Sequence, residues 1–189
     1  LWLRRHTGPL RDFARSAAAT AELIDALGLL GADGRVLDAG CGAGAMVPEI
    51  SRRLGEAGRY IGFDVHAPSI RWCRRQYASD PRLRFELAAV ASAYGSARGR
   101  PASGYRFPIE DGGATLVLAK SLFTHLGREE AAHYLCEVRR ALSPGSPALV
   151  TAFLFGETGA QAPLVRREFP FEDEGGRVRY RSRMRPTAA

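Results

Sequence analysis

The chain has 189 residues, of which 46% are hydrophobic and 25% are charged. This length is typical of one globular domain, whose core is large enough to fold without disulfides or a metal. No run approaches about 18 consecutive apolar residues, which excludes a membrane-spanning helix. The first residues show no apolar stretch with a cleavage site, so no signal peptide is expected.

The net charge is +7, with 27 Lys and Arg residues against 20 Asp and Glu residues. Such a charge leaves an anionic partner open, including nucleic acid. Most arginines are scattered, however, which favours a compositional origin. The three cysteines and four histidines match the spacing of neither a zinc site nor a disulfide framework, so no metal site is predicted. A reducing cytoplasm is the expected setting.

A leading helix is expected over residues 13–30. Apolar residues recur there at helical spacing, which predicts that they form its buried face. They are Phe13, Ala17, Leu23, Leu27 and Leu30. Gly28 and Gly31 are expected to end the helix.

Short apolar runs then alternate with helical patterns. Strands are predicted at 35–38, 60–64, 83–90, 114–119 and 148–155, and helices at 45–55, 68–78 and 128–142. The last helix is expected to bury Ala132, Leu135, Val138 and Leu142. Alternation of this kind implies parallel strands joined by right-handed crossovers, in a sheet covered on both faces. The predicted fold is therefore α/β: a single Rossmann-like, doubly wound domain with a core at 35–155.

The first predicted strand leads directly into a glycine-rich loop, Gly40-Cys41-Gly42-Ala43-Gly44. In doubly wound sheets ligands bind at the carboxyl ends of the strands, where glycines let the backbone turn sharply and approach a ligand. The next helix offers free amide donors at its N-terminus. Asp64 ends the second predicted strand, where its carboxylate can accept from both hydroxyls of a ribose. The loop also fits the looser dinucleotide fingerprint, which keeps a nicotinamide cofactor open.

Asp38 separates these two cofactor types, because it stands two residues before the first glycine. A carboxylate there does not help to bind an anionic pyrophosphate. It suits a cationic ligand that carries an amino group. A sulfonium amino acid joined to a nucleoside, S-adenosylmethionine, meets these demands.

Four stretches together resemble the class I S-adenosylmethionine-dependent methyltransferases. They are VLDAGCGAG (36–44), YIGFDVHAPSI (60–70), FPIEDGGATLVLAKSLFTHL (107–126) and EVRRALSPGSPALVTAFL (137–154). The resemblance implies a sheet of strand order 3-2-1-4-5. It also implies transfer of a methyl group from S-adenosylmethionine by in-line displacement, and a small molecule is the favoured acceptor.

The resemblance further implies roles for single residues. The implied cofactor-binding residues are Asp38, Gly40, Cys41, Gly42, Gly44, Asp64, Val65, Ala89, Val90 and Lys120. Asp38 and the loop amides would face the methionine part, Asp64 the ribose and Val65 the adenine. His125 is the candidate catalytic base, with a capping or packing histidine as the alternative.

The sequence departs from the family pattern at Ala89 and at its end. An acidic residue is expected at position 89, and losing its hydrogen bond to the adenine amine costs about 0.5–1.5 kcal/mol. The 34 residues after Phe155 are too few for the usual closing strands, so a truncated or unusual fold is expected. Residues 156–189 are predicted to hold a β-hairpin and a tail. The edge strand 148–155 is then expected to be covered by the hairpin, a missing segment, a partner or a second copy in a homo-oligomer.

Three further functions stay open. The charge and the alternating arginines of the hairpin, at 177–185, keep a nucleic-acid methyltransferase in view. The departures at Ala89 and at the end favour a non-catalytic module that binds S-adenosylmethionine and needs a partner. A nicotinamide-dependent oxidoreductase is the least favoured.

Overall fold

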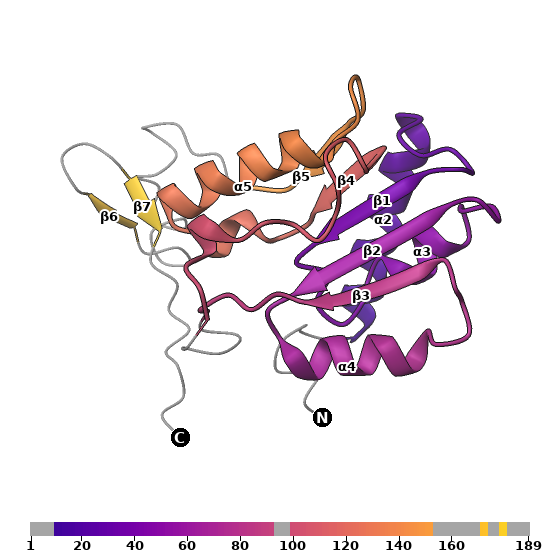
Figure 1. The fold of residues 1–189 in the computed structure, drawn as a ribbon, viewed down its shortest axis with the longest axis horizontal. Helices are drawn as coiled ribbons and strands as arrows, with labels where there is room; N and C mark the ends of the chain where they lie inside the picture. Colours follow the sequence, from indigo (N-terminus) through magenta and orange to yellow (C-terminus); the bar gives the residue numbers. More distant parts are fainter. Residues whose placement is uncertain (1–9, 93–98, 153–170, 174–177, 181–189) are drawn as a thin grey trace.

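The computed structural model describes residues 10–92, 99–152, 171–173 and 178–180 (Figure 1). A five-stranded parallel sheet forms its centre. The strands are β1 (Arg35–Ala39), β2 (Arg59–Asp64), β3 (Leu83–Leu87), β4 (Leu116–Ala119) and β5 (Ala148–Val150). Their order is β3-β2-β1-β4-β5, and every neighbouring pair is parallel. The predicted fold class and strand order are confirmed.

Helices cover both faces of this sheet. They are α2 (Leu10–Ala26), α3 (Val47–Ser51), α4 (Ala67–Gln76) and α5 (Arg128–Ala141), with short 3-10 helices η1 (Ala102–Gly104) and η2 (Phe123–His125). In Figure 1, α5 lies on the opposite side of the sheet from α2, α3 and α4. The order of the strands reverses between β1 and β4, so a crevice is expected at their carboxyl ends.

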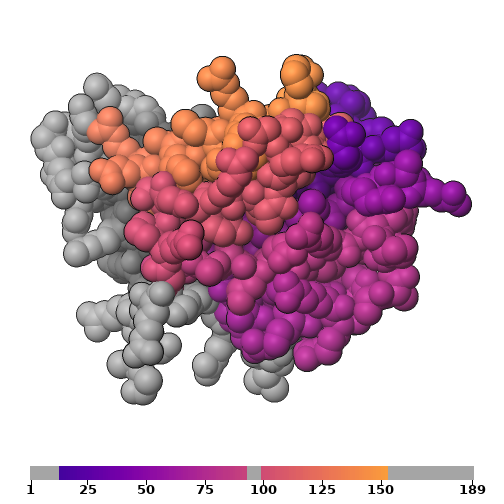
Figure 2. Space-filling view, in the orientation of Figure 1, coloured from indigo at the N-terminus to yellow at the C-terminus, as the bar shows by residue number. Residues whose placement is uncertain are grey.

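Two hydrophobic clusters fill the space between the sheet and these helices. Successive strand residues point to opposite faces, so Val36 joins one cluster and Leu37 the other. The first cluster contains Ile24, Ile50 and Ile70 from α2, α3 and α4. The second contains Tyr134, Val138 and Ala141 from α5, together with Phe107. Figure 2 shows the segment between η1 and β4 filling the surface between α5 and the β2–β3 side of the molecule.

The expected buried face of the leading helix is wrong in part. Leu23 and Leu27 are 44% and 59% exposed, whereas Ala17, Ala21 and Ile24 are buried. The helix also ends at Ala26 and not at residue 30. The buried residues stand at i, i+4 and i+7, and the small side chains of Ala17 and Ala21 let α2 approach the sheet closely.

The expected face of α5 is also wrong in part. Leu135 is 53% exposed and Ala132 is exposed, whereas Tyr134 and Glu137 are buried. The carboxylate of Glu137 accepts from the backbone amide of Phe107 at 2.7 Å and pairs with Arg140 at 2.7 Å. A charged residue can occupy the core face because these partners replace water, and the hydrophobic pattern cannot show this.

Several strands are shorter than expected, and β3 and β5 end at Leu87 and Val150. Two short strands pair antiparallel within the segment predicted to hold a hairpin, β6 (Phe171–Asp173) and β7 (Val178–Tyr180), and β6 extends into residues expected to form the turn. They form a separate sheet, so within the described residues β5 remains the edge strand. The remaining tail and the side chains of the hairpin arginines lie outside the described residues. No helix in the described ranges is long and apolar enough to cross a membrane.

Candidate functional site

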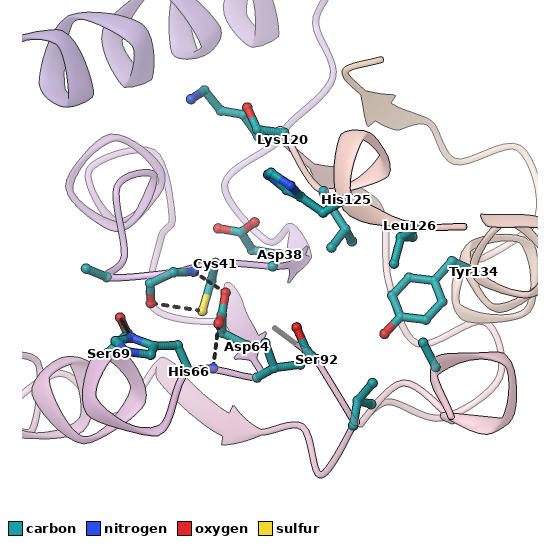
Figure 3. A pocket seen from close by; sticks show the side chains of 18 of the residues that line it. Asp38, Cys41, Asp64, His66, Ser69, Ser92, Lys120, His125, Leu126 and Tyr134 are labelled. Atoms are coloured by element: carbon teal, nitrogen blue, oxygen red, sulfur yellow. Dashed lines mark hydrogen bonds between the residues drawn. The ribbon is translucent and has the colours of Figure 1, made fainter. Parts of the chain in front are cut away.

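A cavity of about 660 Å³ lies at the carboxyl ends of the strands, where the crevice is expected (Figure 3). Such a volume is within the range of small-molecule sites. One wall comes from the loop after β1 and the end of β2. The other wall comes from the segment after β4 and the first turns of α5, and residues 90–92 after β3 close one end.

The carboxylate of Asp64 is fixed by two backbone amides on the first wall. Gly42 N donates to Asp64 Oδ2 and His66 N donates to Oδ1, both at 2.8 Å (Figure 3). Each oxygen therefore accepts one hydrogen bond and can accept at least one more. The arrangement leaves a preorganised, bidentate acceptor at the edge of the cavity.

Asp38 supplies a second carboxylate on the same wall and is only 3% exposed. Burial raises the pKa of Asp38 to about 6, against the hydrogen bond from Tyr60, while the nearby charge of Asp64 raises it further. Tyr60 donates its hydroxyl to Asp38 Oδ2 at 2.6 Å. Burial destabilises the ionised form of this carboxylate, and a cation bound beside it would stabilise that form again.

Gly42 leaves open space beside these carboxylates. Its φ is +53°, in the left-handed region, and a Cβ built there meets no atom within 4 Å. At Gly44, by contrast, a Cβ would lie 3.2 Å from Cys73 Sγ and 3.1 Å from Val47 Cγ2. Gly42 therefore widens the cavity, whereas Gly44 allows the loop to pack on α3 and α4.

The opposite wall is built on an unusual backbone conformation. Ser121 follows β4 directly and has a φ of 58°, which is rare for a residue with a side chain. Its backbone amide donates to Thr151 Oγ1 at 2.6 Å, and Thr124 Oγ1 donates to its carbonyl at 3.0 Å. These contacts hold the turn that brings Lys120 and His125 to the cavity.

His125 lies in this wall, and its side chain is partly exposed (Figure 3). Partial burial of the ring lowers the pKa of His125 below its usual value of 6.5. The imidazole is therefore predominantly neutral at pH 7 and can accept a proton. Glu130 and Tyr134 complete the wall from α5.

The structure brings most of the residues singled out in the sequence to this cavity. The predicted cofactor-binding residues that line it are Asp38, Gly40, Cys41, Gly42, Asp64, Val65, Val90 and Lys120. Gly44 and Ala89 are described but do not line it. Ala89 is exposed, because residues 89–91 run beside Arg100 as an extended segment and alternate residues face opposite ways.

The thiol of Cys41 is buried, and burial raises the pKa of Cys41 well above the usual value. It remains protonated and packs against Gly62, where an added Cβ would lie 2.9 Å from its sulfur. Within the described ranges, no group of three or more His, Cys, Asp or Glu side chains is arranged to hold a metal ion.

Sequence reasoning missed several residues of the cavity. They include Phe13, Met46, His66, Ser69, Ser92, Glu130 and Tyr134. A signal was present for two of them, because Glu130 and Tyr134 are four residues apart and share a helix face. The others come from segments without regular periodicity.

The fold and the cavity together define a doubly wound α/β protein with a cavity of small-molecule size at the carboxyl ends of its strands. The sequence matches the family model described as "Methyltransferase domain" over residues 36–145. The chain therefore belongs to this methyltransferase family. The resemblance to the class I S-adenosylmethionine-dependent enzymes is thereby confirmed.

Solved structures show the same fold. A SAM-dependent methyltransferase from Aquifex aeolicus matches with a TM-score of 0.58 and 16% identity, over 90% of this chain and 88% of that chain. Geranyl diphosphate C-methyltransferase from Streptomyces coelicolor A3(2), in complex with Mg²⁺, geranyl-S-thiolodiphosphate and S-adenosyl-L-homocysteine, matches with a TM-score of 0.52 and 22% identity. The match covers 69% of this chain but only 42% of that enzyme, so the present chain spans less than half of its length.

Proposed function

We propose that this protein transfers the methyl group of S-adenosylmethionine to a small-molecule acceptor. The observation that carries the proposal is the pair of carboxylates, Asp38 and Asp64, which line one cavity together with the open space at Gly42. Membership of the methyltransferase family supports the reaction and the cofactor. The similarity in fold to geranyl diphosphate C-methyltransferase supports a small molecule as the class of acceptor.

The residues of the first wall fit the chemistry of this cofactor. Asp38 would bind the amino group of the methionine part, since a buried carboxylate is stabilised by a cation. Asp64 would accept from the two ribose hydroxyls, with its oxygens already oriented by Gly42 N and His66 N. Val65 and Val90 offer apolar surface of the cavity to the base.

When bound, the cofactor supplies a methyl group that its sulfonium has already activated. The protein therefore contributes mainly alignment of the acceptor with that group. The wall after β4, from Lys120 to Leu126, would orient the acceptor. Where the acceptor must lose a proton, an imidazole nitrogen of His125 would take it.

The proposal is tested by calorimetric titration of the full chain with S-adenosylhomocysteine, the product of methyl transfer. Saturable binding to one site is expected. Asp33→Asn is a matched control, because Asp33 is exposed and precedes the amino end of β1. That variant should bind like the wild type. If the wild-type protein gives no heat at millimolar ligand, the proposed function is wrong.

A further inference from the structure

Tyr134 places a hydroxyl at the cavity that no described residue engages. The residue is only 3% exposed, in the middle of α5. No hydrogen bond joins its hydroxyl to any other residue in the described part of the chain, so its capacity to donate and accept is left to water or a ligand. Figure 3 shows the hydroxyl pointing from the helix into the cavity that Tyr134 lines.

The hydroxyl is not sealed in the core. Within the described residues, every completely buried polar side-chain atom has a hydrogen-bond partner. The Tyr134 oxygen has none, so it must reach the cavity surface. A hydroxyl in this position is available to a ligand.

The ring that carries the hydroxyl is held rigidly. It packs edge-on against Phe107, with ring centroids 5.0 Å apart and an angle of 82° between the planes. His133, the preceding residue, is hydrogen-bonded through Nε2 to the carbonyl of Tyr105 at 2.8 Å. The position of the hydroxyl is thus fixed before any ligand binds, which lowers the entropic cost of binding.

The place of Tyr134 in the cavity indicates which part of a ligand it meets. In Figure 3, Lys120 lies at the top, Asp38 and Asp64 lie below it, and Ser92 and Tyr134 lie to the right of the two carboxylates. If Asp64 binds the ribose and Asp38 the amino acid, the base extends from Asp64 away from Asp38. Because β3 lies beyond β2 from β1 in the sheet, this direction leads toward Val90 and Ser92, which follow β3 and line the same cavity as Tyr134.

We propose that the Tyr134 hydroxyl binds the polar edge of the adenine base. This inference rests on the proposed function, because it takes the ligand to be an adenine nucleoside. The edge of adenine carries an amine donor next to ring-nitrogen acceptors, and a phenol hydroxyl can both donate and accept. Burial raises the pKa of Tyr134, so the hydroxyl keeps its proton and both capacities at any working pH.

The test uses Tyr134→Phe, which removes the oxygen and keeps the ring. Affinity is measured by calorimetry for S-adenosylhomocysteine and for 5′-methylthioadenosine, which has the same nucleoside without the amino-acid part. Both should bind about two- to tenfold more weakly, by the same factor, as expected for one hydrogen bond. Tyr105→Phe is the matched control, since Tyr105 belongs to the same aromatic cluster but is not among the cavity-lining residues; it should leave both affinities unchanged.

A ligand variant gives a second measurement, which also uses the wild-type protein. In the benzimidazole analogue of 5′-methylthioadenosine, the base keeps its shape but loses the amine and the edge nitrogens. The wild type should bind this analogue more weakly than 5′-methylthioadenosine. Tyr134→Phe should cause no further loss for the analogue, because two changes that remove one contact are not additive.

The outcomes separate the two proposals. If Tyr134→Phe binds both nucleosides as tightly as the wild type, this inference is overturned. If the variant then also has an increased KM for the acceptor, the hydroxyl binds the acceptor instead. A loss confined to S-adenosylhomocysteine overturns it as well, because the hydroxyl would then respond to the amino-acid part. A wild-type protein that binds neither ligand refutes the proposed function itself.

Discussion

The two walls of the cavity are built in different ways. On the wall formed by β1 and β2, backbone amides of Gly42 and His66 hold one carboxylate and Tyr60 holds the other. On the wall formed after β4 and by α5, a left-handed Ser121 and a 3-10 turn carry the side chains. The first wall is a compact hydrogen-bonded unit, whereas the second depends on a turn anchored 30 residues away at Thr151.

The two walls therefore have different roles in the proposed reaction. The first wall presents fixed carboxylates suited to one invariant ligand, the cofactor. The second wall combines apolar, basic and acidic side chains on a turn, which is the part of such a site that can be adapted to an acceptor. Substitutions in the first wall should therefore change the affinity for the cofactor, whereas substitutions in the second wall should change kcat.

The largest effect is expected for His125→Asn. If His125 takes a proton from the acceptor, kcat should fall about a hundredfold or more, with unchanged affinity for S-adenosylhomocysteine. The lowered pKa of His125 makes the base form grow as pH rises to that pKa, so wild-type kcat/KM should rise below about pH 6.5 and then level off. This rise should disappear in the variant. A variant with normal kcat would show that His125 is only a packing residue.

Asp64→Asn should affect binding and not the turn after β4. A hydrogen bond to a charged group contributes about 1.5–3 kcal/mol, so affinity for S-adenosylhomocysteine should fall about 10- to 100-fold in calorimetry. The pH dependence of kcat at saturating cofactor should stay that of the wild type. Equal affinity in the variant and in Asp33→Asn would exclude Asp64 from the site.

Asp38→Asn tests whether the negative charge of Asp38 binds the ligand, through the dependence of ligand affinity on pH. The cationic amino group should prefer the ionised carboxylate, so wild-type affinity for S-adenosylhomocysteine should increase as pH rises through about 6. The variant should bind about tenfold more weakly at pH 8, with no such step. Binding of the wild type that is flat between pH 5 and 8, a range set by that pKa, would argue against this contact.

The same pKa shift makes a prediction for stability. Because the pKa of Asp38 is raised from 3.8 to about 6, the folded protein holds this proton more tightly than the unfolded chain. The contribution of Asp38 to the free energy of unfolding therefore falls as pH rises between these two values. Urea unfolding of wild type and Asp38→Asn at both ends of that range should show the difference.

The smallest effects are expected for Ser121 and Thr151 in the second wall. Ser121→Gly relieves the left-handed strain but loosens the chain, so the free energy of unfolding should change by about 1 kcal/mol or less. Thr151→Val removes the anchoring hydroxyl. Both variants should lower kcat a few fold without changing cofactor affinity. Thr151→Ser keeps the hydroxyl, so its kcat should equal that of the wild type. A change in cofactor affinity alone would contradict the division between the walls.

The first wall could be predicted from the sequence because its residues are adjacent to strand ends. Asp38, Gly42 and Asp64 follow directly from two short apolar runs and the glycines between them. The second wall could be predicted only in part: Lys120 and His125 come after the fourth strand, but the conformation of Ser121 depends on Thr151. Tyr134 was missed because an aromatic residue within a helix is expected to lie in the hydrophobic core. Only the three-dimensional structure shows that its hydroxyl lies at the cavity.

The fold shows the same limit. The fold class and the helix positions follow from the alternating pattern, and the strand order follows from the resemblance to the methyltransferases. The buried faces of α2 and α5 follow from neither. In α5 the burial of Glu137 depends on Arg140 and on the amide of Phe107, 30 residues away. In α2 the face with Ala17, Ala21 and Ile24 is buried and leaves Leu23 exposed, and Leu27 lies beyond the end of the helix.

The central claim is that the carboxylates around Gly42 receive an adenine nucleoside with a cationic amino acid. A crystal structure of the protein with S-adenosylhomocysteine measures this directly. The predicted result is density beside Gly42, with both ribose hydroxyls on Asp64, the amino group toward Asp38 and the base toward Tyr134. Density elsewhere, or this region filled by side chains with ligand bound at another site, would contradict it.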